Sequence, residues 1–202
     1  MKTRFMTLLA ALLIMVSSGC NAQTATEVLQ KTASVVGRKG GCSAHFTLSS
    51  EKYGKASGSL AIKGNKFNAR TDKATVWYNG KTQWSYMKST NEVNVSNPTQ
   101  AQQMSMNPMT FINIYKTGYN SSMTANGAEY VVHLTAQNTK RSVQEMYITI
   151  NKKTYVPTKV RMRQGKSWSD ITISQFKAQN QPNSTFSFNA KDFPTAEVVD
   201  LR

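Results

Sequence analysis

The side chains that most often perform catalysis are scarce in this sequence and form no catalytic or metal-binding pattern. Its two histidines, His45 and His133, fall at polar-facing positions within alternating stretches. The acids Asp170, Asp192 and Asp200 are isolated from one another late in the chain. There is no G-x-S-x-G, P-loop, C-x-x-C or histidine-rich motif. The sequence therefore predicts no catalytic residue, no metal site and no cofactor.

Large aromatic side chains are better placed for binding than for catalysis. Asn79-Gly80 is a two-residue hairpin signal between two strand-like segments. The period of two in these segments puts Trp77, Trp84 and Tyr86 on one face of the expected strand pair. These rings suit an apolar binding surface, and ordinary core packing explains them equally well.

Methionines and further aromatics gather between residues 98 and 118, where the strand pattern stops. Asn107-Pro108 is typical of a helix N-cap followed by a first-turn proline. We therefore expect one short helix before Met106 and another from Pro108 to Thr117. Thioether chains adapt to irregular contacts, so such helices suit a ligand of variable shape; permanent packing on a sheet is the equally weighted alternative. Their shared apolar face comprises Met104, Pro108, Phe111, Ile112 and Tyr115, with Met106 and Met109 beside it.

The remaining elements are one leading helix and a sheet. Thr24 and Glu27 match a capping box, and apolar residues recur at helical spacing until Gly37. From Cys42 the period changes to two, with Cys42, Ala44, Phe46 and Leu48 facing one way. About ten strands and an inserted helical pair predict a single antiparallel α+β domain. The further strand-like stretches are 57–63, 65–71, 75–78, 81–86, 93–95, 130–134, 146–150, 156–162, 171–173 and, as a strand or strand-like tail, 186–188.

Composition excludes several classes of protein. The chain has 202 residues, 39% of them apolar and 17% charged, which fits one folded domain and not a disordered or collagen-like chain. The formal net charge is +15. The cations are dispersed along the chain, which favours a solvated surface; attraction to anionic lipid headgroups or to an acidic partner is the functional alternative. We expect no nucleic-acid partner, because the chain carries an export signal.

That signal occupies residues 1–22. Lys2 and Arg4 precede an uninterrupted apolar run from Met6 to Val16, which is too short for a membrane anchor. Cleavage after Ala22 would release a soluble periplasmic domain, 23–202. The alternative is acylation of Cys20 and a membrane-tethered protein.

Cys42 would be the one cysteine left after that cleavage, so no intramolecular disulfide is expected. We interpret Cys42 as a small buried hydrophobic residue. The nearby His45 falls on the opposite side of an alternating strand, where it cannot easily activate the thiol.

Five segments together resemble one family, the LolA-like periplasmic carriers of outer-membrane lipoproteins, in the form common among Bacteroidetes. The segments are Ala44-His45-Phe46-Thr47, Gly58 to Phe67, Trp77 to Tyr86, Asn107-Pro108 and Phe186 to Arg202. They cover nearly the whole chain after residue 22 and occur in the right order. The motif N-G-K-T-x-W-x-Y after a strand that contains Trp77 is the most specific part.

The resemblance implies an unclosed, strongly curved antiparallel barrel of about ten or eleven strands. A lid of short helices would cover its concave side and leave a hydrophobic cavity. It also implies a monomeric, non-enzymatic carrier that takes acylated lipoproteins from an ATP-driven (ABC) inner-membrane releasing complex to an outer-membrane acceptor. The alternatives are an envelope protein that binds another lipid, or a tethered acceptor if Cys20 is acylated. The family's latch arginine has no counterpart here, because Gly64 stands at its position.

Acyl-chain chemistry suggests which residues would form the binding site. Burying one methylene contributes roughly 0.8 kcal/mol, so shielding a chain of about fourteen contributes on the order of 11 kcal/mol. The weaker enzymatic alternative is a lipid-ester hydrolase that depends on His133. The expected lipid-binding residues are Trp77, Trp84 and Tyr86 as walls, Phe46, Leu60, Ile62 and Phe67 as floor, and Met104, Met109, Phe111 and Tyr115 as lid.

Overall fold

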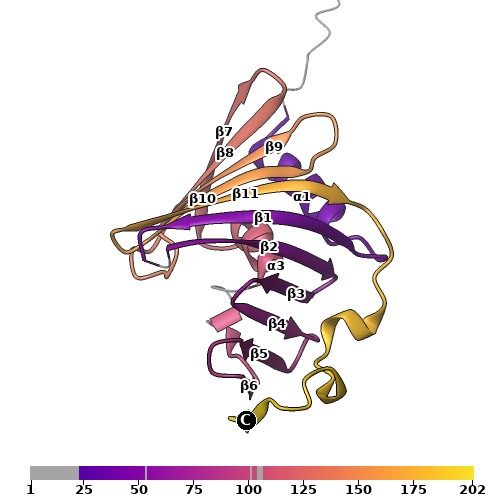
Figure 1. Cartoon of the computed structure of the whole chain (residues 1–202). Coiled ribbons are helices and arrows are strands. Elements are labelled where there is room, and N and C mark those ends of the chain that lie inside the picture. The colour runs from indigo at the N-terminus through magenta and orange to yellow at the C-terminus, as the bar shows by residue number, and fades with distance from the viewer. Residues whose placement is uncertain (1–22, 53, 101, 104–106) are drawn as a thin grey trace, which may run out of the picture.

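One twelve-stranded sheet, strongly curved but not closed, dominates the computed structural model of the chain (Figure 1). The structure describes residues 23–52, 54–100, 102–103 and 107–202. The strand order is β12-β6-β5-β4-β3-β2-β1-β11-β10-β9-β8-β7, and neighbours pair antiparallel except β12 and β6, which run parallel. Within the described residues the two end strands, β12 and β7, do not meet. The predicted open, curved α+β fold is therefore confirmed.

The strands follow one another along the chain as hairpins, with helices between β6 and β7 and before β12. The first six strands are β1 (Cys42–Ser50), β2 (Gly54–Lys63), β3 (Lys66–Thr71), β4 (Ala74–Tyr78), β5 (Gln83–Met87) and β6 (Glu92–Ser96). The others are β7 (Tyr119–Asn126), β8 (Glu129–Ala136), β9 (Glu145–Asn151), β10 (Pro157–Gln164), β11 (Ser167–Lys177) and β12 (Glu197–Asp200).

Helix α1 (Ala25–Val36) fills one half of the concave face. It begins with the predicted capping box: the Glu27 N–H donates to Thr24 Oγ1 at 3.2 Å, and the Thr24 N–H donates to Glu27 Oε2 at 2.9 Å. Val28 and Leu29 are fully buried. They belong to a core cluster with the inward-facing residues of β8, β9 and β10, namely Val132, Leu134, Met146, Ile148, Ile150, Val160 and Met162.

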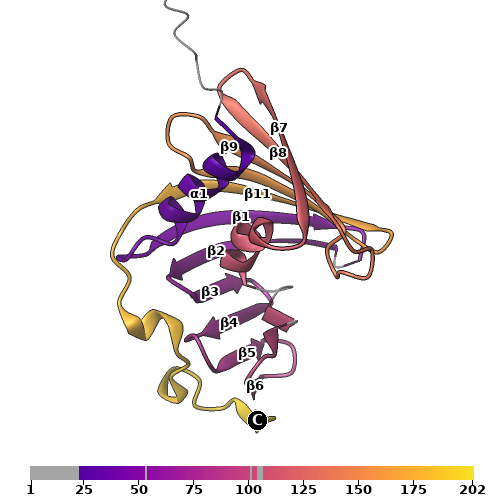
Figure 2. The same ribbon diagram turned by 180° about the vertical axis from the view of Figure 1, so that it is seen from behind.

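A much shorter helix lies over the other half of the concave face. Figure 2 shows α1 and α3 in front of the sheet. Helix α3 (Pro108–Asn113) continues into the 3-10 helix η1 (Ile114–Lys116), close to the predicted span of 108–117. Residues 100, 102 and 103 are also helical, and Met104 and Met106 lie outside the described residues. We call α3 together with η1 the lid.

The β4–β5 hairpin has a four-residue loop, and the predicted two-residue turn is wrong. Asn79 causes the difference: its Oδ1 accepts the N–H groups of Lys81 at 3.0 Å and Thr82 at 2.9 Å, which stabilises a wider loop. Trp77 consequently pairs with Trp84. Because this shift in register is even, the two indoles still share a face, as predicted.

The C-terminal segment alternates between short helices and extended stretches. Of the strand or strand-like tail expected at 186–188, the strand is not found, because Phe186 ends a 3-10 helix, η2 (Asn183–Phe186), whose hydrogen bonds are local, and Ser187 is extended. A second short helix, η3 (Ala190–Asp192), precedes β12. In Figure 1 this yellow segment descends beside β3–β5 and ends next to β6. Phe186 is fully buried and anchors the segment.

Candidate functional site

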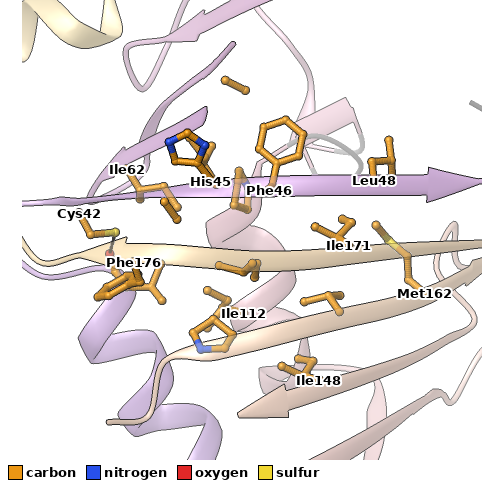
Figure 3. A pocket seen from close by; sticks show the side chains of 18 of the residues that line it. Cys42, His45, Phe46, Leu48, Ile62, Ile112, Ile148, Met162, Ile171 and Phe176 are labelled. Carbon is orange, nitrogen blue, oxygen red and sulfur yellow. Dashed lines mark hydrogen bonds between the residues drawn. The ribbon is translucent and has the colours of Figure 1, made fainter. Parts of the chain in front are cut away.

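A cavity of about 590 Å³ lies on the concave face, beside the half that α1 fills (Figure 3). Strands β1, β2, β9, β10 and β11 and the lid contribute most of its walls, with single residues from α1 (Val36) and β3 (Ala69) and Gln102. The lining is mostly aliphatic, with few polar groups and no acidic side chain among the described residues. The main apolar residues are Phe46, Leu48, Leu60, Ile62, Pro108, Ile112, Ile148, Val160, Met162, Ile171, Ile173 and Phe176.

Strand alternation places these side chains in rows across neighbouring strands. Phe46 and Leu48 of β1 lie opposite Ile173 and Ile171 of β11. On the other side of β1, Ala44 lies opposite Leu60. Directly opposite residues point to the same face of a sheet, so each row forms a continuous apolar wall.

A β-bulge in β11 adds Phe176 to the cavity. Between the pairs His45–Ser174 and Ser43–Lys177, β11 contains one residue more than β1, and Gln175 has φ of 51°. The extra residue reverses the alternation, so that Phe176 faces inward although strict alternation from Ile173 would turn it outward. No signal in the sequence marked this bulge.

Cys42 contributes an uncharged thiol to the cavity wall. Its side chain is 2% exposed, and Sγ lies 3.4 Å from the Val36 carbonyl oxygen, which accepts its S–H. Burial raises the pKa of Cys42 to about 11, against a smaller opposing effect of the Arg38 charge. Cys42 is therefore an apolar wall residue, as the sequence interpretation expects.

Asn107 joins the lid to the rim of the sheet. Its side-chain Oδ1 accepts the Met109 N–H at 2.9 Å, which caps α3 as predicted. Its Nδ2 donates to the carbonyl oxygen of Asn65, in the β2–β3 turn, at 3.0 Å. Asn107 is only 3% exposed, so this hydrogen bond is protected from water.

The family model described as "Outer membrane lipoprotein carrier protein LolA" matches residues 16–166, about three quarters of the chain. This chain belongs to the LolA family. No curated protein sequence matches it. The fold is similar to an uncharacterized conserved protein from Thermus thermophilus, with a TM-score of 0.60, 15% identity and coverage of 88% of this chain and 99% of that one.

Two further solved structures are less similar to this LolA family member. A LolA superfamily protein from Nitrosomonas europaea has a TM-score of 0.47 and 12% identity, with 83% of this chain and 99% of that chain covered. The complex structure of Pseudomonas aeruginosa MucA/MucB has a TM-score of 0.48 and 10% identity, with 87% and 63% covered. No helix among the described residues is both long and apolar enough to cross a membrane.

The expected floor residues of this LolA family member lie on the concave face. Phe46, Leu60 and Ile62 line the cavity. Phe67 does not; it is 3% exposed and packs in a cluster with Ile62 and Tyr78, its ring centroid 5.7 Å from that of Tyr78. Among residues that were not expected, Ile171, Ile173, Val160 and Met162 complete the lining, and their alternating spacing was the available signal.

The two expected lid residues whose side chains the structure describes, Met109 and Tyr115, are not part of the cavity lining. Met109 packs against the cluster that contains Val36 and Ile112, and Tyr115 packs against the α1 cluster. Phe111 lies in α3, but its side chain is outside what the structure describes, as is all of Met104. Among the described side chains of α3, Pro108 and Ile112 line the cavity, since they occupy the side of this short helix that faces it.

Trp77, Trp84 and Tyr86, expected as walls of the cavity, lie on the outer face of the sheet instead. Trp77 packs edge-on against Phe188 and Phe193 of the C-terminal segment, with ring centroids 5.6 and 5.5 Å apart. Tyr86 lies 4.7 Å from Phe193, and Trp84 shares this outer face through its pairing with Trp77. Alternation shows which side chains share a face, but it does not show which face becomes concave. The inward residues of this region are Ala69, Val76, Phe67 and Tyr78.

His133 also points away from the cavity. Its neighbours Val132 and Leu134 are fully buried on the inner face, so alternation turns His133 outward. There it stacks on Tyr147 at 4.2 Å, and its Nε2 lies 3.0 Å from Glu145 Oε1. Burial pushes the pKa of Glu145 up, but hydrogen bonds from Tyr147, Arg163 and His133 outweigh it and lower that pKa overall. Over the described residues, no three His, Cys, Asp or Glu side chains are grouped to hold a metal.

Proposed function

We propose that this chain is a non-enzymatic periplasmic carrier that shelters the acyl chains of lipoproteins in the concave-face cavity and moves them from the inner to the outer membrane. The observation that carries the proposal is the aliphatic cavity of about 590 Å³, kept unfilled beside a solid core on the same sheet. Its volume lies within the roughly 300–1,000 Å³ usual for ligand pockets.

The chemistry of the lining favours hydrocarbon over a polar ligand. Leu, Ile, Val, Met and Phe side chains dominate the wall, and Cys42 adds an uncharged thiol. Against such a wall, each buried methylene contributes about 0.8 kcal/mol of binding free energy, and the acyl chain is not fixed in one position. Acyl chains of different lengths can then bind, which suits a carrier of many lipoproteins.

The lid supports loading and release without a covalent step. Helix α3 has six residues, too few to be stable without contacts to the rest of the protein. It is held by the hydrogen bond from Asn107 and by the packing of Ile112 against Val36 and Ile62. An entering acyl chain would displace these apolar contacts, and they would re-form when cargo leaves. Release would then depend on a next protein that binds the cargo more strongly.

The partners in this proposal are acylated lipoproteins, the inner-membrane ABC complex that releases them and an acceptor in the outer membrane. The leader at 1–22 would direct export, and cleavage after Ala22 would leave the carrier free to diffuse. The formal charge, +15 for the full chain and +13 once Lys2 and Arg4 leave with the leader, would bring the carrier toward anionic membrane surfaces. Lys152 and Lys153, in the β9–β10 turn, are candidates for that attraction.

The test uses the full chain expressed with its leader and purified from the periplasm. Native mass spectrometry is expected to find acylated cargo bound to the wild-type protein. Replacing Ile173, in the cavity wall, with Glu should remove the cargo, whereas Thr172→Glu, one residue away and exposed, should retain it. Equal cargo in both variants, or none in the wild type, would contradict the proposal. An intact mass that includes an acylated Cys20 would instead favour a tethered acceptor.

A further inference from the structure

The two edges of the twelve-stranded sheet end in different ways. At one edge lies the C-terminal strand β12, which pairs in parallel with β6 and has only four residues, with the charged Glu197 and Asp200 at its ends. The other edge is β7, which pairs with β8 on one side only. None of the described strands pairs with its outer side, so that row of backbone N–H and C=O groups is open.

Strand β7 lacks the features that usually protect an exposed edge. It spans Tyr119–Asn126, with no charged residue and no proline, although the chain contains 25 Lys and Arg residues. All eight residues pair with β8 without a shift in register, so no bulge bends the edge away. Six of the eight are exposed. A long, regular, uncharged edge of this kind is a template for another strand.

We propose that β7 binds an extended peptide by strand addition, and that this peptide is the polar linker that follows the acylated N-terminal residue of a lipoprotein cargo. The inference rests on the proposed function. Position supports it: the lid ends at Lys116, η1 contacts β7, and β7 begins at Tyr119. Figure 2 shows β7 rising from the region of α3 along the margin of the sheet. A polypeptide that leaves the cavity alongside η1 would pass this edge.

The positive charge near β7 favours the binding of a neutral or acidic linker over pairing with a second copy of this chain. Arg141 lies over the Tyr119 ring, 5.0 Å from its centroid, at the start of β7. Lys152 donates to the Gly127 carbonyl at 2.6 Å, next to the end of β7. Two copies paired along β7 would bring these cations together, along with two chains that each carry +13 after the leader with Lys2 and Arg4 is removed, which opposes dimerisation. An acidic or uncharged peptide has no such cost.

Strand addition also fits cargo whose linkers differ in sequence. Its hydrogen bonds use the peptide backbone, and the exposed side chains of β7 are the small groups of Asn, Ser, Thr and Ala, which do not favour particular residues in the partner strand. Once the acyl chain occupies the cavity, the linker is held near β7 at a high effective concentration. A weak edge interaction is then sufficient to align the linker.

The test compares three probes: free palmitate, a palmitoylated ten-residue peptide rich in Ser, Asn and Asp, and the same peptide with alternate backbone nitrogens methylated. The wild-type protein is expected to bind the unmethylated peptide about tenfold more tightly than the methylated one, because methylation removes the edge hydrogen bonds. Hydrogen exchange of β7 amides should slow with the unmethylated peptide and not with palmitate.

The matched variants place two lysines at an edge strand or at a central one. Ser122→Lys with Thr124→Lys should reduce the tenfold preference to less than about twofold, since lysines block edge pairing. Thr47→Lys with Ser49→Lys, at outward-facing positions of β1, should preserve it. Normal palmitate binding with no preference for the unmethylated peptide would overturn the edge proposal alone. Loss of palmitate binding would overturn the proposed function, and a dimer broken by the β7 lysines would assign the edge to a second copy.

Discussion

The two halves of the concave face have the same strand pattern but different covers. Over β8–β10, the twelve-residue helix α1 inserts Val28 and Leu29, and the residues beneath it, such as Leu134, are fully buried. Over β1, β2 and β11, the cover that the structure describes is the short lid with Gln102 beside it, and Phe46 and Leu60 line an open cavity. The boundary residues Ile148, Val160 and Met162 belong to both halves.

This difference indicates a division of labour between stability and binding. The filled half has the dense packing that stabilises a domain and holds the strands in place. The hollow half keeps apolar surface that the protein does not cover for itself, which leaves it able to gain free energy from a ligand. A rigid core next to the cavity also prevents the cavity from collapsing when it is empty.

The largest expected effect is a difference in the free energy of unfolding between a substitution in the filled half and one in the hollow half. Leu29→Ala, in the filled half, should lower the free energy of unfolding by about 2–5 kcal/mol, because it leaves a cavity in a closed core. Leu60→Ala, in the cavity wall, should cost about 1 kcal/mol or less, because the side chain is only half-buried. Urea unfolding monitored by circular dichroism measures both. Similar losses in the two variants would mean that the hollow half is packed as firmly as the filled one.

Local patterns in the sequence predicted the elements that create this division. The capping box at Thr24 and the helical spacing up to Gly37 predicted α1, and alternation from Cys42 predicted which side chains of β1 share the face that lies on the cavity. Asn107-Pro108 predicted the start of the lid. Each of these depends on contacts between residues close in sequence, and together with the family resemblance they were sufficient for the fold.

The errors come from interactions that local patterns do not encode. The face that holds Trp77 becomes the outer one because the distant C-terminal segment covers it with Phe188 and Phe193. The bulge at Gln175 depends on how β11 pairs with β1. Strand β7 was not predicted, because an exposed edge needs no apolar alternation, and β12 exists only through its pairing with β6.

The second prediction concerns the reactivity of Cys42, which shows whether water reaches this part of the cavity wall. With its pKa raised to about 11 from 9.0, the thiol of the folded protein should hold about a hundredth of the thiolate of an unfolded chain near pH 8. Burial favours the neutral form, so the rate of alkylation by iodoacetamide should keep rising tenfold per pH unit past pH 9 and level off only near pH 11. Intact mass at timed intervals gives these rates.

The shape of that pH profile distinguishes charge from access. Poor access slows alkylation equally at every pH, whereas a raised pKa moves the midpoint of the profile. The protein unfolded in urea is the reference and should level off near pH 9. A folded protein with the same midpoint would mean that water reaches Cys42 freely and that this wall is not apolar.

The smallest expected effect is on the rate at which a ligand leaves, and it tests how the two covers, α1 and the lid, are held in place. Leu29 holds α1 by burial, but the lid depends on the hydrogen bond from Asn107 to the Asn65 carbonyl. Asn107→Asp retains an oxygen to cap the Met109 N–H and puts a carboxylate where the donor was, beside that carbonyl. The lid should open more often, and a bound fluorescent fatty acid should leave about five- to tenfold faster, for a hydrogen bond of about 1 kcal/mol. Stopped-flow transfer to lipid vesicles measures this rate.

Asn107→Ser is the matched control, since serine also caps a helix but is too short to replace the contact with Asn65. It should give an intermediate rate, because it loses the donor without adding the repulsion between carboxylate and carbonyl. The free energy of unfolding should fall by only about 1 kcal/mol in both variants, since the contact of the closed lid is lost while the filled core is unchanged. If both variants released the fatty acid at the wild-type rate, the lid would not control the cavity, and the difference between the two covers would be one of packing only.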